Sequence, residues 1–143
     1  MTMGGWYAPL GLYCSEELGG LSISRFCEAV AAEGSICTPG CNRALHLHPL
    51  FNNIDVYNQG KPTRFANLPD GIELGQRAGS LPVSEGIQKR VFSVPWFKHD
   101  RSEIIEEHAA AFRKVAENYK GLLFGDTGGK EEVGSWGLSA GRK

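Results

Sequence analysis

The chain has 143 residues, of which 41% are hydrophobic and 22% charged, and its formal net charge is −1. This composition predicts one folded domain with a packed core and argues against a disordered chain. No run of Lys or Arg forms a basic stripe, so nucleic acid and anionic membranes are not expected as partners. The apolar runs are too short to span a bilayer and the N-terminus lacks the pattern of a signal peptide, so we expect a cytoplasmic protein.

The first forty residues predict two strands with a helix between them. Residues 6–14 and 35–38 are the expected strands, because both are short segments rich in apolar or aromatic side chains. Ser22 can cap the helix and Gly34 can end it. The apolar face of this helix follows at helical spacing and comprises Ile23, Phe26, Cys27 and Val30.

The middle of the chain has little periodicity. Residues 52–79 are rich in Gly, Pro and Asn, and a loop of this length in a compact domain tends to be functional or mobile. A helix over residues 82–90 follows, because Pro82 suits a first turn and Val83 and Ile87 lie one turn apart. Residues 91–94 are expected to form a strand.

The third helix has the clearest pattern. Asp100 and Glu103 have capping-box spacing, and Gly121 is expected to end the helix. Its apolar stripe comprises Ile104, Ile105, His108, Phe112, Val115, Ala116 and Tyr119. From Gly125 onward the Gly-rich sequence predicts a flexible tail over residues 125–143.

This order of elements predicts an α+β fold, with a small antiparallel-type sheet and helices packed on one face. We place the folded domain at residues 1–124, including the long variable loop at 52–79.

The densest group of reactive side chains lies in the segment CTPGCNRALHLHPLF. Four of its residues are possible zinc ligands, namely Cys37, Cys41, His46 and His48. If residues 45–48 are extended, the two histidines point to the same side. The Cys and His spacings are not those of the usual zinc knuckle or finger, so the alternative is a turn with thiols and histidines at the edge of a cleft. Beside them, Asn42 and Arg43 could bind an anion or a sugar hydroxyl, or could simply be solvated.

Four segments, in this order and spacing, resemble the end of a DegT/DnrJ/EryC1/StrS aminotransferase. They are LGGLSISRFCEAVAAEG, PGCNRALHLHPLF, SLPVSEGIQKRVFSVPWF and EIIEEHAAAFRKVAEN, and the resemblance covers roughly residues 5–123. Members of this family are fold-type-I enzymes that use pyridoxal phosphate (PLP) to move an amino group from glutamate or glutamine onto keto-sugars or keto-cyclitols. Their last part is a small α+β domain that completes the cleft of a large, PLP-binding domain.

The resemblance implies that Asn42, Arg43, His46 and His48 face the substrate cleft, with His46 at the histidine of a PLH-like motif. Cys41 stands where the family usually has an aromatic residue. None of the lysines has the family's Schiff-base context, so we expect no catalytic residue and no cofactor in this chain. PLP is implied only for the full-length enzyme.

Three functions follow as alternatives. The first is the small domain of a PLP-dependent aminotransferase, inactive alone, whose partner is the large domain or subunit of the same enzyme. The second is a stand-alone binding protein or homodimer that reuses the fold and covers apolar surface with a new partner. The third is a small zinc protein that uses Cys37, Cys41, His46 and His48.

Overall fold

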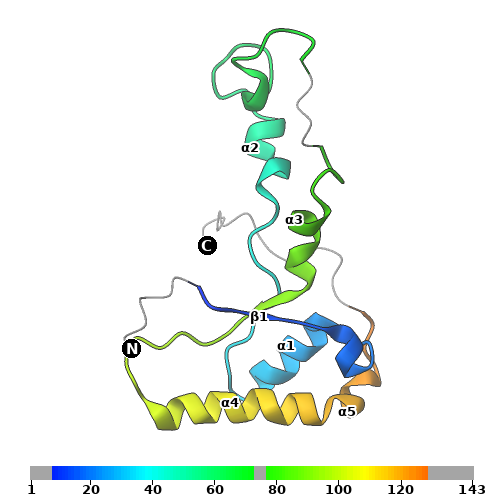
Figure 1. Ribbon diagram of the computed structural model, residues 1–143, viewed down its shortest axis with the longest axis vertical. Helices are drawn as coiled ribbons and strands as arrows, with labels where there is room; N and C mark the ends of the chain where they lie inside the picture. Colours follow the sequence, from blue (N-terminus) through cyan, green and yellow to red (C-terminus); the bar gives the residue numbers. More distant parts are fainter. Residues whose placement is uncertain (1–7, 73–76, 129–143) are drawn as a thin grey trace.

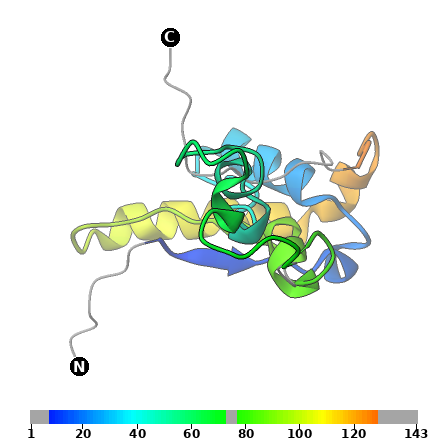
Figure 2. The same ribbon diagram turned by 90° about the horizontal axis from the view of Figure 1, so that it is seen from above.

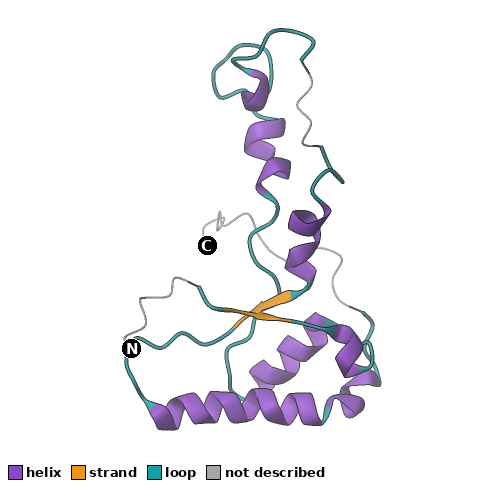
Figure 3. Cartoon of the chain, in the orientation of Figure 1, coloured by secondary structure: helices purple, strands orange, loops and turns teal. Residues whose placement is uncertain are grey.

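The computed structural model describes residues 8–72 and 77–128. Figure 1 shows a body, made of residues 8–41 and 91–128, and an arm, made of residues 42–90, that rises from it. The expected α+β class is confirmed, because helices accompany a small two-stranded antiparallel sheet (Figure 3). Seen from above, the arm overlaps the body rather than extending from its side (Figure 2).

The sheet consists of two short strands at the base of the arm. β1 (Leu10–Leu12) pairs antiparallel with β2 (Val91–Ser93), and Gly11 lies opposite Phe92. Both strands are shorter than the expected 6–14 and 91–94, and residues 6 and 7 lie outside the described part of the chain.

The strand expected at residues 35–38 is wrong. This segment runs beside β2 and contributes only an isolated antiparallel bridge between Pro39 and Phe92. Thr38 and Ser93 exchange two bonds, in which the Ser93 amide donates to the Thr38 carbonyl (2.9 Å) and the Thr38 amide to the Ser93 hydroxyl (2.9 Å). On the other side of this bridge the Gly40 amide donates to the Val91 carbonyl (2.7 Å), so the segment pairs with β2 only around Pro39 and Phe92.

The first helix is confirmed. α1 spans Ile23–Ala32, and the Ser22 hydroxyl accepts a hydrogen bond from the Arg25 amide (3.2 Å), as an N-cap does. Gly34 adopts φ +90°, a left-handed conformation that favours glycine, and it turns the chain back along the helix. The predicted apolar face is the buried one and comprises Ile23, Phe26, Cys27 and Val30.

The last long helix differs from its prediction at both ends. α4 spans Ser102–Glu117, with Arg101 as the N-cap and no side-chain capping bond. The expected capping box is wrong, because Asp100 instead accepts a hydrogen bond from the Ser102 hydroxyl (3.2 Å). Gly121 does not end α4 but lies inside a separate helix, α5 (Tyr119–Leu123).

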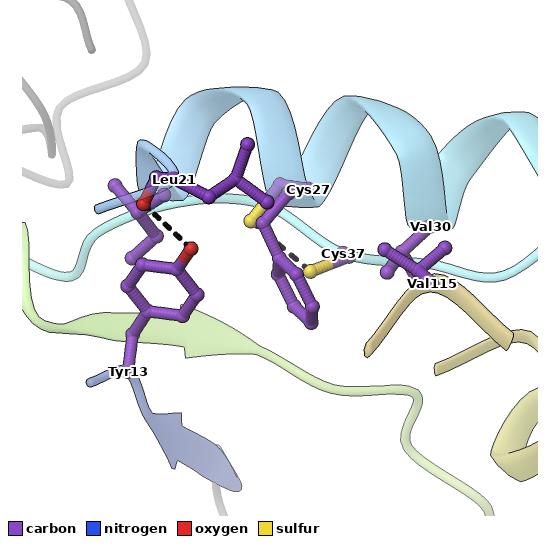
Figure 4. Close-up of a cluster of buried hydrophobic side chains, with 8 residues drawn as sticks. Tyr13, Leu21, Cys27, Val30, Cys37 and Val115 are labelled. Carbon is purple, nitrogen blue, oxygen red and sulfur yellow. Dashed lines mark hydrogen bonds between the residues drawn. The ribbon is translucent and has the colours of Figure 1, made fainter. Parts of the chain in front are cut away.

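The core of the body lies where α1 and α4 meet one face of the sheet. Phe92 of β2 stacks on Phe112 of α4 at 5.7 Å between ring centroids and contacts Phe26 of α1 at 5.6 Å. Figure 4 shows part of this cluster, including the hydrogen bond from the Tyr13 hydroxyl to the Leu21 carbonyl (2.8 Å). The buried members are Tyr13, Leu21, Ile23, Phe26, Cys27, Val30, Cys37 and Val115.

The arm consists of two legs and a tip. The ascending leg holds a 3₁₀ turn (Leu45–Leu47) and α2 (Pro49–Asn52), and the descending leg holds α3 (Pro82–Gly86) and a 3₁₀ turn (Ile87–Lys89). The single helix expected at 82–90 is therefore divided after Gly86. The tip contains most of the loop expected at 52–79, with a 3₁₀ turn at Thr63–Phe65, and residues 73–76 lie outside the described residues.

The chain remains fixed to the body beyond Gly125, where the sequence suggests a tail. The Asp126 carboxylate accepts hydrogen bonds from the amide (2.7 Å) and the hydroxyl (2.8 Å) of Ser22, at the start of α1. These bonds hold the pKa of Asp126 below its ordinary value. The rest of the expected tail, residues 129–143, lies outside the described residues.

Candidate functional site

The two histidines singled out by the sequence lie in the ascending leg. The segment that carries them is a 3₁₀ turn followed by a helix, and is therefore not the extended strand that would point both rings to one side. Each ring instead has its own partner. His48 is buried and caps α2, with its Nδ1 accepting a hydrogen bond from the Leu50 amide (3.0 Å).

His46 reaches across to the descending leg. Its Nε2 lies 2.9 Å from Oε1 of Glu85 in α3, and the two side chains are only 7% and 19% exposed. This pair joins two segments that are 39 residues apart in sequence. It is therefore a tertiary contact that fixes the legs of the arm to each other.

Glu85 is held by the backbone as well as by His46. Its carboxylate accepts hydrogen bonds from the amides of Gly79 (2.7 Å) and Leu81 (3.1 Å), at the entrance to α3. These amides, with the bond to His46, keep the pKa of Glu85 below its ordinary value, the Gly79 amide having the largest effect. The carboxylate is therefore negatively charged at neutral pH.

Asn52, the last residue of α2, holds the backbone of the ascending leg through its side chain. Its amide nitrogen donates to the carbonyls of both His46 and His48, each at 2.9 Å. Its side-chain oxygen accepts a hydrogen bond from Arg64 of the tip (2.6 Å). The backbone that carries the two histidines is thus fixed on one side by Asn52 and, through His46, by Glu85 on the other.

The sequence analysis did not identify Asn52, Glu85 or Arg64. A signal for Glu85 was present, because an acidic residue after a helix-starting proline can bond the free amides of the first turn. Nothing in the sequence pairs it with His46. The predicted residues Asn42 and Arg43 lie lower, at the foot of the arm, where Asn42 is exposed and Arg43 is half-buried.

The four possible zinc ligands have separate contacts. Cys37 packs in the body against Cys27, with 3.1 Å between the sulfurs, and the Cys41 thiol lies 3.4 Å from the Asn42 carbonyl. Over residues 8–72 and 77–128, no three or more His, Cys, Asp or Glu side chains are grouped so that they could hold a metal ion. The zinc alternative therefore has no support from the geometry.

Apolar surface surrounds the polar interior of the arm. A shallow hollow of about 410 Å³ lies on the descending leg, and its rim includes Val83, which is 80% exposed. Leu45, on the ascending leg, is 66% exposed. The hollow is lined by Ser80, Leu81, Pro82, Val83, Ser84 and Ile87.

The lysines of the described residues are exposed or have a partner of their own. A Schiff-base lysine needs an enclosed site with a carboxylate for the pyridine nitrogen and donors for the phosphate. Lys61 bonds to the Leu68 carbonyl (3.0 Å), and Lys114 pairs with Glu33 (2.6 Å). The others lie exposed on the surface, and they are Lys89, Lys98 and Lys120.

No family model, curated protein or solved structure matches the chain. Among the described residues, no helix combines the length and the apolar character needed to cross a membrane.

Proposed function

We propose that the chain is the small, C-terminal domain of a PLP-dependent aminotransferase that acts on keto-sugars or keto-cyclitols. In this proposal it is inactive alone and contributes one wall of a cleft when it docks on a large, PLP-binding domain. The resemblance of four ordered sequence segments supports the proposal, and so does an α+β body that carries a projecting arm.

One observation carries the docking part of the proposal. The arm exposes large apolar side chains that the body does not cover, Val83 at 80% and Leu45 at 66%, close in sequence to the His46–Glu85 pair. Large exposed apolar side chains that gather on one part of a molecule are typical of sites that another protein covers. A partner that packed on the arm would exclude water from this surface. The ascending leg, which carries His46, would then lie at the interface.

His46 would then act as a preorganised polar group. Its Nε2 is engaged by Glu85 and its backbone is held by Asn52, so the 7% of its side chain that stays exposed would present one orientation to a bound sugar. Such fixed groups orient a substrate at a small cost in entropy. PLP, bound by the large domain, would supply the electron sink for amino transfer.

The test is complementation. The purified chain is mixed with the large domain of a sugar aminotransferase truncated before its own small domain. Complex formation is measured by size exclusion with light scattering, and activity is measured by amination of a keto-sugar. We expect a one-to-one complex and restored amination. If neither a complex nor activity is found with large domains from several subfamilies, the proposal is wrong.

Two matched variants locate the docking surface. Val83→Asp places a charge at the hollow on the arm and should weaken the complex about tenfold or more, because burial of an unpaired charge is costly. Phe124→Asp is the control, since Phe124 is 92% exposed and lies just after α5, in the body and outside the arm. Equal weakening by both variants would contradict docking through the arm.

The same exposed side chains also favour a second candidate, a stand-alone binding protein or homodimer. In that case the apolar surface of the arm would be covered by a second copy. Light scattering of the chain alone distinguishes the two, because a dimer that Val83→Asp converts to a monomer would favour the second candidate.

A further inference from the structure

Two thiols meet in the core of the body, in a contact that the proposed function does not use. Cys27 is on the buried face of α1, and Cys37 is on the segment that returns along the helix after Gly34. Their sulfurs lie 3.1 Å apart and share a hydrogen bond, as Figure 4 shows. Cys27 is 2% exposed and Cys37 is 9% exposed, and both cysteines are free.

The turn at Gly34 brings the two residues to the same level. Cys27 lies seven residues before Gly34 along a helix, a distance of about 10 Å at 1.5 Å per residue. Cys37 lies three residues after it in extended chain, again about 10 Å. The backbone path therefore brings the two residues to the same level, and their side chains meet there in the core.

We propose that Cys27 and Cys37 form a dithiol modification site that hydrogen peroxide oxidises to a disulfide. In the first step the Cys37 sulfur attacks the peroxide, so that an S–O bond forms, the O–O bond breaks and water leaves. In the second step the Cys27 sulfur attacks the Cys37 sulfenic acid, which forms the S–S bond and releases a second water. The two sulfurs together give up the two electrons that reduce the peroxide.

The surroundings favour Cys37 as the attacking residue. It is the less buried of the two, and its neighbours in sequence, Ile36 and Thr38, are exposed, which gives a small neutral oxidant a route to the sulfur. The hydrogen-bonded contact between the two sulfurs lowers the pKa of Cys37, whereas burial raises the pKa of Cys41. Cys27 lies within reach as the resolving thiol.

The disulfide would tie α1 to the segment that leads into the arm. Residues 38–40 bond to β2, where the Gly40 amide donates to the Val91 carbonyl (2.7 Å) and the Ser93 amide to the Thr38 carbonyl (2.9 Å). The Cys27–Cys37 disulfide would therefore fix the base of the ascending leg against the core. Oxidation should raise the melting temperature by about 5–15 °C, because it closes a short loop in the unfolded chain.

The experiment treats the native, full chain with hydrogen peroxide, blocks the remaining thiols under denaturing conditions and maps the peptides by mass spectrometry. Trypsin alone leaves Cys27, Cys37 and Cys41 in one peptide, residues 26–43. Trypsin together with a Glu-specific protease separates Cys27 (residues 26–28) from Cys37 and Cys41 (residues 34–43). The Cys41→Ser variant then assigns the partner of Cys27. The same treatment of the urea-unfolded chain is the control.

We expect the Cys27–Cys37 link in the wild type and in Cys41→Ser, its reversal by dithiothreitol, and a mixture of pairs only in the unfolded control. The proposal is overturned if native Cys27 and Cys37 both remain free to be blocked, or if Cys37 stops at the sulfenic or sulfinic acid. It is also overturned if the native protein gives the same mixture of pairs as the unfolded chain. The result does not depend on whether the chain docks on a large domain.

Discussion

Glu85 fixes the arm through three hydrogen bonds from three different residues. Two donors are the amides of Gly79 and Leu81, at the entrance to α3, and the third contact is to His46 on the other leg. A carboxylate is suited to this position because it accepts several bonds at once. The charge that makes it a good acceptor also makes the contact sensitive to acid.

The structure predicts a dependence of stability on pH that is specific to Glu85. Its folded-state pKa lies below the ordinary value of 4.5, so the stabilisation is fully present above pH 4.5 and is lost as the pH falls through the lower, folded-state pKa. Glu85→Gln should lower the melting temperature near pH 7, and the difference from the wild type should shrink below pH 4.5. Thermal unfolding between pH 3 and pH 7 measures this.

The control for Glu85 is Glu107→Gln, because Glu107 is exposed on α4. This variant should follow the wild type at every pH. A constant difference between Glu85→Gln and the wild type across the whole range would show that the carboxylate charge is not the stabilising feature.

At the scale of the element, the strand pairing depends on a glycine. A Cβ atom on Gly11 would lie 2.3–2.8 Å from the ring atoms of Phe92, its partner across the sheet. The ring covers the glycine and is itself held between aromatic side chains of α1 and α4. It therefore has little freedom to move away, and the two strands tolerate only glycine at this position.

Gly11→Ala should destabilise the protein by about 1–3 kcal/mol, the usual cost of overpacking in a rigid core. Gly86→Ala is the matched control, since Gly86 ends α3 and a Cβ there meets nothing within 4 Å. It should be neutral or stabilising by up to about 1 kcal/mol. Urea unfolding of both variants measures the two effects, and equal destabilisation would contradict the role of the Phe92 ring.

The elements that could be predicted are those whose pattern is local. α1 was predicted from its cap at Ser22 and its apolar face, and most of α4 from its stripe, because helical periodicity follows from the backbone alone. The expected strand at 35–38 failed because β propensity does not say whether a neighbouring strand offers a full ladder, and here only the Pro39–Phe92 bridge forms.

At the scale of the whole molecule, the arm itself could not be predicted. Its two legs come together through His46 and Glu85, and its ascending leg is fixed to the tip by Asn52 and Arg64. These are polar contacts between distant residues, for which a single sequence gives no signal. The sequence placed His46 and His48 in a functional segment but did not show that each already has a partner within the arm.

Body and arm differ in what holds them together, and this difference predicts how they open. The body has a core in which Leu21 and Val30 are fully buried, whereas the helices of the arm, α2 and α3, contain no buried residue. Segments with few buried apolar contacts open at a lower free energy than the core. We therefore expect the amides of α2 and α3 to exchange with deuterium at least about tenfold faster than those of α1 and α4.

Hydrogen exchange followed by mass spectrometry of the native chain tests this expectation, and Val30 and Val115 mark the slow reference segments. The Glu85→Gln variant should increase exchange in the arm and leave α1 unchanged, because the contact it weakens joins only the two legs. Docking on a partner should slow exchange in the arm alone, since burial of its apolar surface supplies the contacts that the isolated arm lacks. Equal protection of arm and body in the free chain would instead mean that the two open as one cooperative unit.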